Sequence, residues 1–289
     1  MGELYTLNAP AKINLLLRIT GKRADGFHEL VTLFHPLPAL CDTLRADLTA
    51  QEGITLSCSH PGVPEDGSNL LCKAASRFAE AGKIVPSWHF ELEKNIPVAA
   101  GLGGGSSDAG TLLKFLDEKF PGVPQEKVKD IARSIGADVP FFLAPADAAA
   151  RGIGEKLEYT GQLTVPPVLL IFPDFPVSAA WAYRHLQGMT PQTQAEDELA
   201  ALTEALRSQD FSKAAKLCAN DLEHALFAKF PLLNQLRRNL EEAGALCVHV
   251  SGSGPTLFAL FENENLRHKA AESLARPENL EAGLRIMEC

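Results

Sequence analysis

The sequence has no excess of basic residues. Lysine and arginine number 27 against 36 aspartates and glutamates, which gives a net charge of −9 and a pI near 5.4. Nucleic-acid-binding proteins usually carry a basic face, so we expect no nucleic-acid partner. Any anionic ligand must instead be held by local groups.

The sequence also lacks an uninterrupted apolar run long enough to span a bilayer, and no basic segment followed by an apolar one opens it. We therefore expect a cytoplasmic protein with no membrane partner. The six cysteines form no Cys-x-x-Cys pair and the histidines do not cluster, which argues against a zinc site or a disulfide framework. We expect the cysteines to be reduced and mostly structural.

Glycine is concentrated in the stretch "IPVAAGLGGGSSDAGTLLKFL" at residues 96–116, which leads directly into an apolar-periodic segment. Two known glycine motifs do not fit it. A P-loop needs a Lys-Ser/Thr pair after its last glycine, and Ser-Ser follows Gly105 instead. A dinucleotide fingerprint needs a third glycine where this chain has Ser106 or Asp108.

A backbone nest at the start of a helix does fit. The unpaired N–H groups and the positive end of the helix dipole bind phosphate there without any net positive charge. Ser106 and Ser107 are candidates to donate to a phosphate or to ligate a metal. Asp108, expected in the first helical turn, suits a structural cap as well as a functional role.

The first half of the chain alternates expected strands and helices. Residues 11–20 alternate in polarity and predict a half-buried strand with Lys12 pointing off the apolar face, followed by a loop at 21–26. A second strand is expected from residue 27 and is ended by Pro36. Asp138 stands before a Val-Pro step, which favours an extended or loop conformation. The other elements expected here are helices over 69–82 (Asn69 as N-cap), from the glycines to 120, and over 124–136, and a strand over 88–97.

The second half restarts with a strand at 168–172 after a Pro- and Gly-rich passage, and we place a domain boundary there, between residues 160 and 161. The segment "SGSGP", Ser251–Pro255, is expected to join two strands as a hairpin turn. The remaining elements expected are helices over 177–186, 195–208, 211–217 and 231–244, strands over 246–250 and 256–261, and a closing helix and strand.

Three segments carry a family resemblance: "PVAAGLGGGSSDAG", "PAKINLLLRITGKRADGFHEL" and "GADVPFF". The first is similar to the phosphate-binding motif of the superfamily that contains galactokinase, homoserine kinase and mevalonate kinase, the GHMP kinases. All three in this order resemble one branch of it, the kinases that phosphorylate the 2-hydroxyl of a cytidine-diphosphate-linked methylerythritol in the non-mevalonate route to isoprenoid precursors. The resemblance runs from about residue 10 through residue 261.

The resemblance implies a two-domain α/β and α+β fold of the GHMP-kinase type. Residues 1–160 would form a mixed α/β, ATP-binding domain with a left-handed βαβ unit. Residues 161–289 would form a smaller, ferredoxin-like α+β domain, with the active site in the cleft between the two. It also implies ATP and Mg²⁺ as cofactors and a protein that is a monomer or a homodimer.

The resemblance further implies a role for individual residues. Asp138 matches the catalytic aspartate that accepts the proton of the substrate hydroxyl, although a loop residue is the alternative. Lys12 matches the lysine that keeps this aspartate ionised and stabilises developing charge, although a solvated surface lysine is the alternative. Asn14 would help to hold the hydroxyl. The nucleotide-binding segment implied is Pro97, Val98, Ala99, Ala100, Gly101, Leu102, Gly103, Gly104, Gly105, Ser106, Ser107 and Asp108.

Recognition of the cytidine end is implied for Phe27, which would stack on the base, and for His28, which would bond its edge. The alternatives are a core phenylalanine and a buried, satisfied histidine. Tyr183 is a candidate second wall of this pocket, with a packing role as the alternative. The Ser251–Pro255 loop resembles a family loop near the substrate phosphates. Rival functions are a kinase of the homoserine or mevalonate type and a nucleotide-binding module without catalysis.

Overall fold

The computed structural model describes residues 4–49, 51–275 and 283–289. The chain forms two compact units that interleave along the sequence. The first unit contains the start of strand β1 and residues 36–98 and 103–145. The second unit contains residues 12–35, 99–102 and 146–289. The expected boundary between residues 160 and 161 stays a prediction.

Seven strands form the larger sheet within the described residues, and the two long strands β1 and β2 contribute to both units. In the first unit, β3 runs parallel to β4, and β4 pairs antiparallel with residues 43–47 of β2. In the second unit, residues 32–34 of β2 pair with β5, and β1 pairs parallel with β8. The strands are β1 (Leu4–Lys22), β2 (His28–Asp47), β3 (Gly53–Cys58), β4 (Ser87–Glu93), β5 (Ala148–Arg151), β6 (Lys156–Tyr159) and β8 (Ala219–Asn220).

Strand β1 is buried on both faces between residues 11 and 17, so the half-buried strand predicted from polarity is wrong. Its polar residues are inside because they bond to one another, and alternation of polarity cannot reveal this. The end predicted for the second strand at Pro36 is also wrong, because β2 continues to Asp47. Pro36 and Pro38 lie between the segments that pair with β5 and β4, so those two pairings keep their N–H donors.

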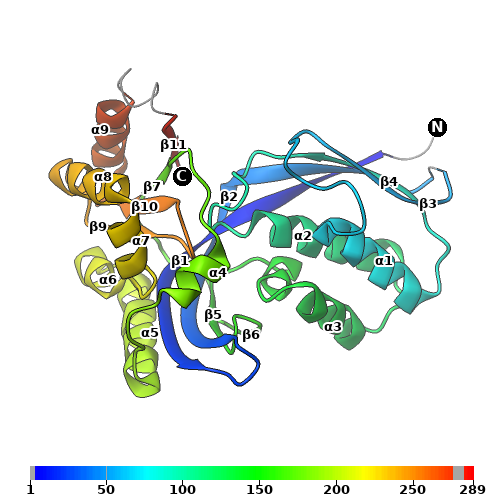
Figure 1. Ribbon diagram of the computed structural model, residues 1–289, viewed down its shortest axis with the longest axis horizontal. Helices are drawn as coiled ribbons and strands as arrows, with labels where there is room; N and C mark the ends of the chain where they lie inside the picture. The colour runs from blue at the N-terminus through cyan, green and yellow to red at the C-terminus, as the bar shows by residue number, and fades with distance from the viewer. Residues whose placement is uncertain (1–3, 50, 276–282) are drawn as a thin grey trace. The chain divides into compact units, whose positions relative to one another are not determined.

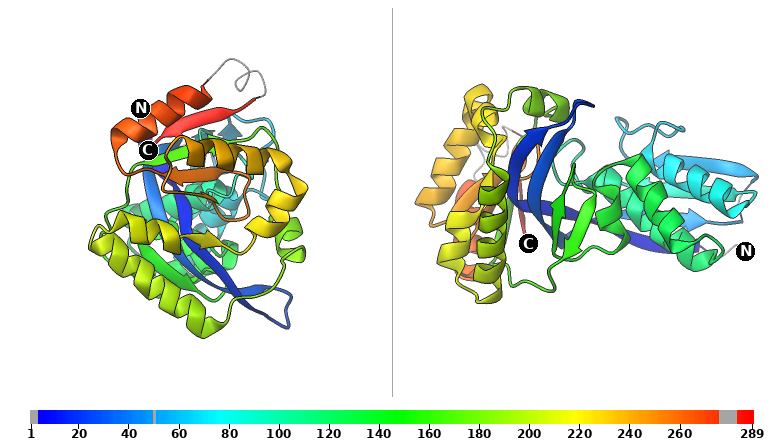
Figure 2. Two further views of the ribbon diagram at one scale, coloured as in Figure 1. Left: turned by 90° about the vertical axis from the view of Figure 1, so that its left-hand side faces the viewer. Right: turned by 90° about the horizontal axis from the view of Figure 1, so that it is seen from below.

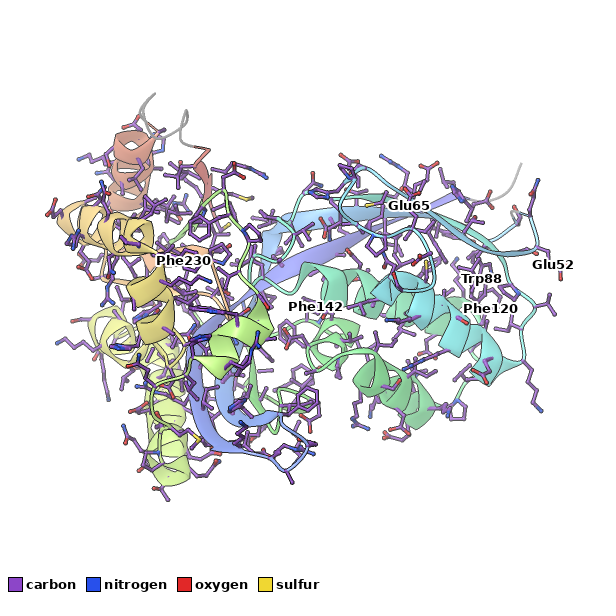
Figure 3. The ribbon with its side chains drawn as sticks, in the orientation of Figure 1. Glu52, Glu65, Trp88, Phe120, Phe142 and Phe230 are labelled. Carbon is purple, nitrogen blue, oxygen red and sulfur yellow. The ribbon has the colours of Figure 1, made fainter. Side chains whose placement is uncertain are left out.

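Three α-helices of the first unit cover one face of its strands (Figure 1). Asn69 caps α1 as predicted, because its side chain accepts a hydrogen bond from the N–H of Leu71. The apolar residues of these helices and of β4 form one core, in which the rings of Trp88 and Phe120 lie 5.6 Å apart (Figure 3). The helices are α1 (Leu70–Gly82), α2 (Gly104–Lys119) and α3 (Gln125–Ile135), followed by the 3₁₀ helix η1 (Val139–Leu143).

The second unit contains a four-stranded sheet in the order β11, β7, β10, β9, with α8 and α9 packed on one face (Figures 1 and 2). All adjacent strands in it are antiparallel. The strands and helices expected here are confirmed, and the short helix α7 was not expected. The elements are β7 (Val168–Phe172), α4 (Ala179–Arg184), α5 (Gln192–Arg207), α6 (Phe211–Leu217), α7 (Glu223–Lys229), α8 (Pro231–Glu242), β9 (Cys247–Val250), β10 (Leu257–Leu260), α9 (Glu264–Leu274) and β11 (Arg285–Glu288).

The six cysteines all lie within the described residues, and none of them forms a disulfide there. Three of them are buried: Cys72, Cys218 and Cys247. Within the same residues, no helix is long and apolar enough to cross a membrane.

Candidate functional site

The glycine-rich segment adopts the backbone that its composition predicts. Gly101 and Gly103 have φ angles of +80° and +73°, in the left-handed region that favours glycine. Gly103 is also the N-cap of α2 and has no side chain to bond the first N–H groups of the helix. Free N–H groups at a helix start and the positive end of the helix dipole are features that favour an anion in general.

Asp108 lies beyond the first turn of α2, so its expected place in the first turn, and with it the alternative of a structural cap, is wrong. It is the fifth residue of the helix and is buried, and its Oδ2 accepts a hydrogen bond of 2.8 Å from Lys94 Nζ. Lys94 also binds Asp42, whose Oδ1 accepts hydrogen bonds from the backbone N–H groups of Asn95 and Ile96 at 2.6 and 2.8 Å. Two carboxylates thus share one buried ammonium group beneath the helix start.

Burial raises the pKa of Asp108 to about 7, although the charge of Lys94 acts in the opposite direction. Within the described residues, Asp108 accepts no comparable pair of backbone N–H bonds, whereas Asp42 accepts those of Asn95 and Ile96. The Oδ1 atom of Asp108 is buried and has no hydrogen-bond partner among the described residues. Asp108 therefore anchors the start of α2 to the end of β4.

The two serines of the segment have different surroundings. Ser107 is fully buried, and its hydroxyl donates a 2.6 Å hydrogen bond to the carbonyl of Pro10, which fastens α2 to β1. Ser106 is half-buried and faces Gly136, because a Cβ atom added at Gly136 would lie 3.9 Å from Ser106 Oγ. The residues that lead into Asp138 therefore run beside the start of α2.

A second close approach, between η1 and α2, holds the residues around Asp138. At Gly110 an added Cβ would lie 2.5 Å from the Cβ of Phe142, so only glycine lets η1 pack this closely on α2 (Phe142 is labelled in Figure 3). Asp138 is the N-cap of η1, with φ −83° and ψ −14°. The extended or loop conformation predicted after Asp138 is wrong, because Pro140 falls at the start of a helix, where its missing N–H is not needed.

Lys12 is buried, with 4% of its surface exposed, so the alternative of a solvated surface lysine is wrong. Its Nζ donates a 2.6 Å hydrogen bond to Asn14 Oδ1 and lies 4.9 Å from the ring centroid of Phe34. Asn14 in turn donates to Thr32 Oγ1 at 2.8 Å. The backbone N–H of Lys12 donates to the carbonyl of Leu102, which ties β1 to the glycine segment.

The residues expected to recognise the base lie together at one end of β2. The rings of His28 and Tyr183 stack with centroids 5.3 Å apart. Phe27 is 58% exposed, so the alternative of a core phenylalanine is wrong. Burial, helped by the nearby charge of Lys22, lowers the pKa of His28, which keeps its ring neutral at pH 7 with one donor and one acceptor.

The Ser251–Pro255 segment joins β9 and β10 as the predicted hairpin, with Val250 opposite Leu257. It also touches the glycine segment. Ser251 Oγ donates a 3.0 Å hydrogen bond to the carbonyl of Gly101, and a Cβ added at Gly101 would lie 2.1 Å from the carbonyl oxygen of Ser251. The two glycine-containing loops are therefore packed backbone against backbone.

The described residues contain no group of three or more His, Cys, Asp or Glu side chains that could hold a metal ion. Ser107, a candidate metal ligand in the sequence, already donates to the Pro10 carbonyl, and Asp108 already binds Lys94. The protein side chains of this segment therefore do not form a cage for Mg²⁺ by themselves.

Lys94 and Asp42 were not found by reading the sequence, although a signal for both was present. Lys94 shares the strand parity of the buried residues Trp88 and Phe90, and Asp42 shares that of Leu44. Charged residues in the buried register of a strand require partners. Asn220 was also missed, and nothing in its local sequence marks it.

Comparison with known proteins gives a consistent result. The model of the GHMP kinases N terminal domain matches residues 69–145, and that of the GHMP kinases C terminal domain matches residues 202–279. The chain is 38% identical over 273 residues to the 4-diphosphocytidyl-2-C-methyl-D-erythritol kinase of Geobacter sulfurreducens, covering 93% of this chain and 94% of the relative. It is 39% identical to the enzyme of the same name from Chlorobium chlorochromatii, covering 91% of each.

Solved structures agree. The crystal structure of a 4-(cytidine 5'-diphospho)-2C-methyl-D-erythritol kinase superposes with a TM-score of 0.79 at 34% identity, over 98% of each chain. A homoserine kinase from Cytophaga hutchinsonii superposes with a TM-score of 0.77 at 19% identity, over 100% of this chain and 95% of that one, which shows a shared fold only. The chain therefore belongs to the GHMP kinases and, among them, to the family of 4-diphosphocytidyl-2-C-methyl-D-erythritol kinases.

Proposed function

We propose that this protein transfers the terminal phosphoryl group of ATP to the 2-hydroxyl of 4-diphosphocytidyl-2-C-methyl-D-erythritol, giving the 2-phosphate and ADP in the non-mevalonate route to isoprenoid precursors. One observation carries the proposal. Relatives of this name are 35–39% identical over more than nine tenths of the chain, whereas homoserine and mevalonate kinases resemble it at 14–19%.

In this reaction the hydroxyl oxygen forms a bond to the γ-phosphorus while the bond from the γ-phosphorus to the bridging oxygen breaks, and ADP leaves. The hydroxyl proton passes to Asp138. Lys12 stabilises the charge that develops on the reacting oxygens. The support for Lys12 is that its ammonium is desolvated and aimed by Asn14, so it needs little reorganisation during the reaction.

The nucleotide phosphates are proposed to bind the segment from Pro97 to Asp108. The support is a helix start with no side-chain cap and two glycines in the left-handed region. Backbone N–H groups bind phosphate without a basic surface, which is how a protein of net charge −9 can hold ATP.

Mg²⁺ is proposed to enter with the nucleotide and to be held chiefly by its phosphates, because Asp108 and Ser107 are already bound within the protein. We expect phosphoryl transfer to stop when EDTA is added and to return with excess Mg²⁺. We further propose that the enzyme works in the cytoplasm as a monomer or homodimer, which size-exclusion chromatography with light scattering tests.

The cytosine base is proposed to stack on Phe27 and to bond His28. Phe27 offers an exposed aromatic face, and the neutral His28 ring offers a fixed donor and acceptor. Tyr183 stacks on His28, which supports a role in orienting the His28 ring, and Tyr183 stays a candidate second wall of the pocket.

An ADP-release assay with purified protein, ATP and a panel of alcohols tests the function. We expect ADP release with the cytidine diphosphate methylerythritol and none with homoserine or mevalonate. Phosphorylation of mevalonate but not of the cytidine compound would overturn the proposal. ATP binding without ADP release for any alcohol would favour the non-catalytic module.

A further inference from the structure

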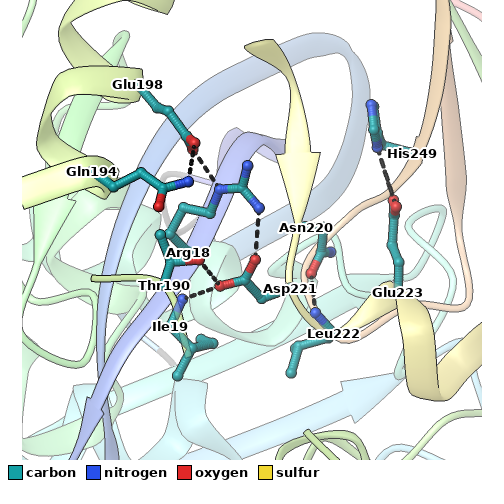
Figure 4. A network of polar contacts seen from close by, with 10 residues as sticks. All are labelled: Arg18, Ile19, Thr190, Gln194, Glu198, Asn220, Asp221, Leu222, Glu223 and His249. Carbon is teal, nitrogen blue, oxygen red and sulfur yellow. Dashed lines mark hydrogen bonds and ion pairs between the residues drawn. The ribbon is translucent and has the colours of Figure 1, made fainter. Parts of the chain in front are cut away.

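The polar side chains of the four-residue segment Asn220–Glu223, "NDLE", form hydrogen bonds with several strands of the second unit (Figure 4). The segment begins at the end of β8, which pairs with β1, and it runs into α7. Asp221 binds Arg18 at 2.7 Å and the N–H of Ile19 at 2.8 Å, which holds this segment on β1. The segment is therefore fixed to the strand that also carries Lys12.

Asn220 is buried and directs its side chain at the backbone of the hairpin between β9 and β10. Its Nδ2 donates to the carbonyl of Val250 at 2.8 Å and to that of Gly252 at 2.7 Å. Its Oδ1 accepts from the N–H of Leu222 at 2.9 Å. Both amide hydrogens are thus used to fix the two ends of the Val250–Gly252 turn.

Glu223 binds Val250 as well, at its backbone N–H. Its Oε1 accepts a 2.7 Å hydrogen bond from the N–H of Val250 and a 3.0 Å hydrogen bond from His249 Nδ1. Val250 therefore has its N–H bound by Glu223 and its carbonyl bound by Asn220. The point at which β9 enters the Ser251–Pro255 loop is set by these two side chains.

That loop contacts the glycine segment at Gly101. The Ser251 hydroxyl donates to the Gly101 carbonyl at 3.0 Å, and the N–H of Thr256 donates to the Ala100 carbonyl at 3.4 Å. An added Cβ at Gly252 would lie 3.0 Å from the Gly101 carbonyl oxygen. A displacement of Ser251 therefore acts on Gly101 through the hydrogen bond of its hydroxyl, and Gly252 lies close to the same carbonyl.

We propose that Asn220 is a positioning residue for nucleotide binding, acting through Gly252 and Ser251 on the backbone of Ala99–Leu102. The proposal rests on the proposed function, in which this backbone belongs to the nucleotide segment. The hydrogen bonds of Asn220 go to Val250, Gly252 and Leu222, beside the loop that contacts Gly101. Its effect is therefore expected on ATP and not on the base of the alcohol substrate.

The test compares Asn220→Ala with Asn234→Ala. Asn234 is a matched control, because its Nδ2 also donates to a backbone carbonyl of the second unit, that of Phe227 at 2.8 Å, away from the loop. Asn220→Ala should raise the KM for ATP about three- to tenfold, the worth of one buried hydrogen bond, and leave the KM for the alcohol unchanged. Asn220→Asp, which keeps the acceptor but turns the donor into an oxygen, should be no better than Asn220→Ala.

Two further measurements do not need the phosphorylation reaction. Calorimetric titration with ADP should show weaker binding to Asn220→Ala than to Asn234→Ala. Hydrogen exchange followed by mass spectrometry should show faster exchange in the peptide spanning residues 99–105 only in Asn220→Ala. If Asn220→Ala does not fold, Ser251→Ala carries the same test, because it removes only the hydroxyl donated to Gly101.

The outcomes separate the two proposals. A folded Asn220→Ala protein with wild-type affinity for ATP and ADP would overturn the positioning role, as would equal changes in both asparagine variants. A wild-type protein that binds ADP but does not phosphorylate the cytidine compound would overturn the proposed function, while the ADP and exchange measurements still decide the role of Asn220. A wild-type protein that binds no nucleotide would overturn both.

Discussion

Replacement of Gly101 by alanine tests the close packing between the two glycine-containing loops. Gly101 has φ +80°, and its added Cβ would lie 2.1 Å from the Ser251 carbonyl oxygen and 2.9 Å from the Gly254 nitrogen. Both contacts are backbone atoms, which cannot turn aside as a flexible side chain would. The loop at 251–254 must therefore move to accommodate a single methyl group.

Gly188 provides the matched control, because it has φ +82° and no heavy atom within 4 Å of an added Cβ. An alanine in the left-handed region costs about 1–2 kcal/mol at either position. The unfolded chain gains the same rigidity in both variants, so that effect cancels in the comparison. Only Gly101→Ala adds the strain of overpacking, about 1–3 kcal/mol. We therefore expect Gly101→Ala to lose about 1–3 kcal/mol more than Gly188→Ala.

Urea unfolding of the two variants at one pH measures this difference, and the KM for ATP reports whether the displaced backbone is the nucleotide segment. We expect Gly101→Ala to raise that KM and Gly188→Ala to leave it unchanged. If the two variants lose the same free energy of unfolding to within about 0.5 kcal/mol, the close approach at Gly101 is refuted. Differences smaller than this are expected between independent sites that share no strain.

Three further predictions concern separate parts of the molecule. Asp138→Asn should lower kcat by roughly 10²–10⁴-fold with little change in the KM for ATP, and wild-type turnover would remove Asp138 from the mechanism. Tyr183→Ala should raise the KM for the cytidine substrate about two- to tenfold, the worth of one ring contact, and an unchanged KM would contradict the role given to that stack. Burial lowers the pKa of His249, but its bonds to Cys247 and Glu223 outweigh this and raise it to about 9. The pKa of a histidine in the unfolded chain is about 6.5, so the stabilisation from protonated His249 is complete below about pH 6.5 and is lost as the pH rises through 9. In urea unfolding, the free energy by which wild type exceeds Glu223→Gln should therefore shrink between about pH 7 and pH 10.

The elements with strong periodicity and recognisable ends were predicted well from the sequence. Helix α1 has its cap at Asn69, and α3 lies between Pro124 and Gly136 as expected. These signals act through the nearest few residues, so a single sequence contains them. The short strand β8 has only two residues and could not be predicted, because it exists through its pairing with β1.

The errors in β1, β2 and η1 have a common physical cause. Each rule used there describes what a residue prefers when nothing else contacts it. Lys12 prefers water, but it is buried because Asn14 and the ring of Phe34 replace that water. Pro36 tends to end a strand, but β2 continues because its pairing partners lie on either side of the proline. Such partners are distant in the sequence and become visible only in the structure.

The glycine segment itself was recognised from the sequence, but the group beneath it was not. A Cβ added at Gly104 would lie 3.3 Å from Lys94 Nζ, so glycine at this position lets the ammonium approach the first residue of α2. With both Asp42 and Asp108 ionised, the buried group would carry a net negative charge under a site proposed to bind phosphates. The pKa of about 7 at Asp108 means that below neutral pH this carboxyl is protonated, and Lys94 and Asp42 then form a neutral pair. Below neutral pH the group therefore anchors the helix start without adding a net negative charge beside the proposed phosphate site, and the backbone N–H groups provide the attraction.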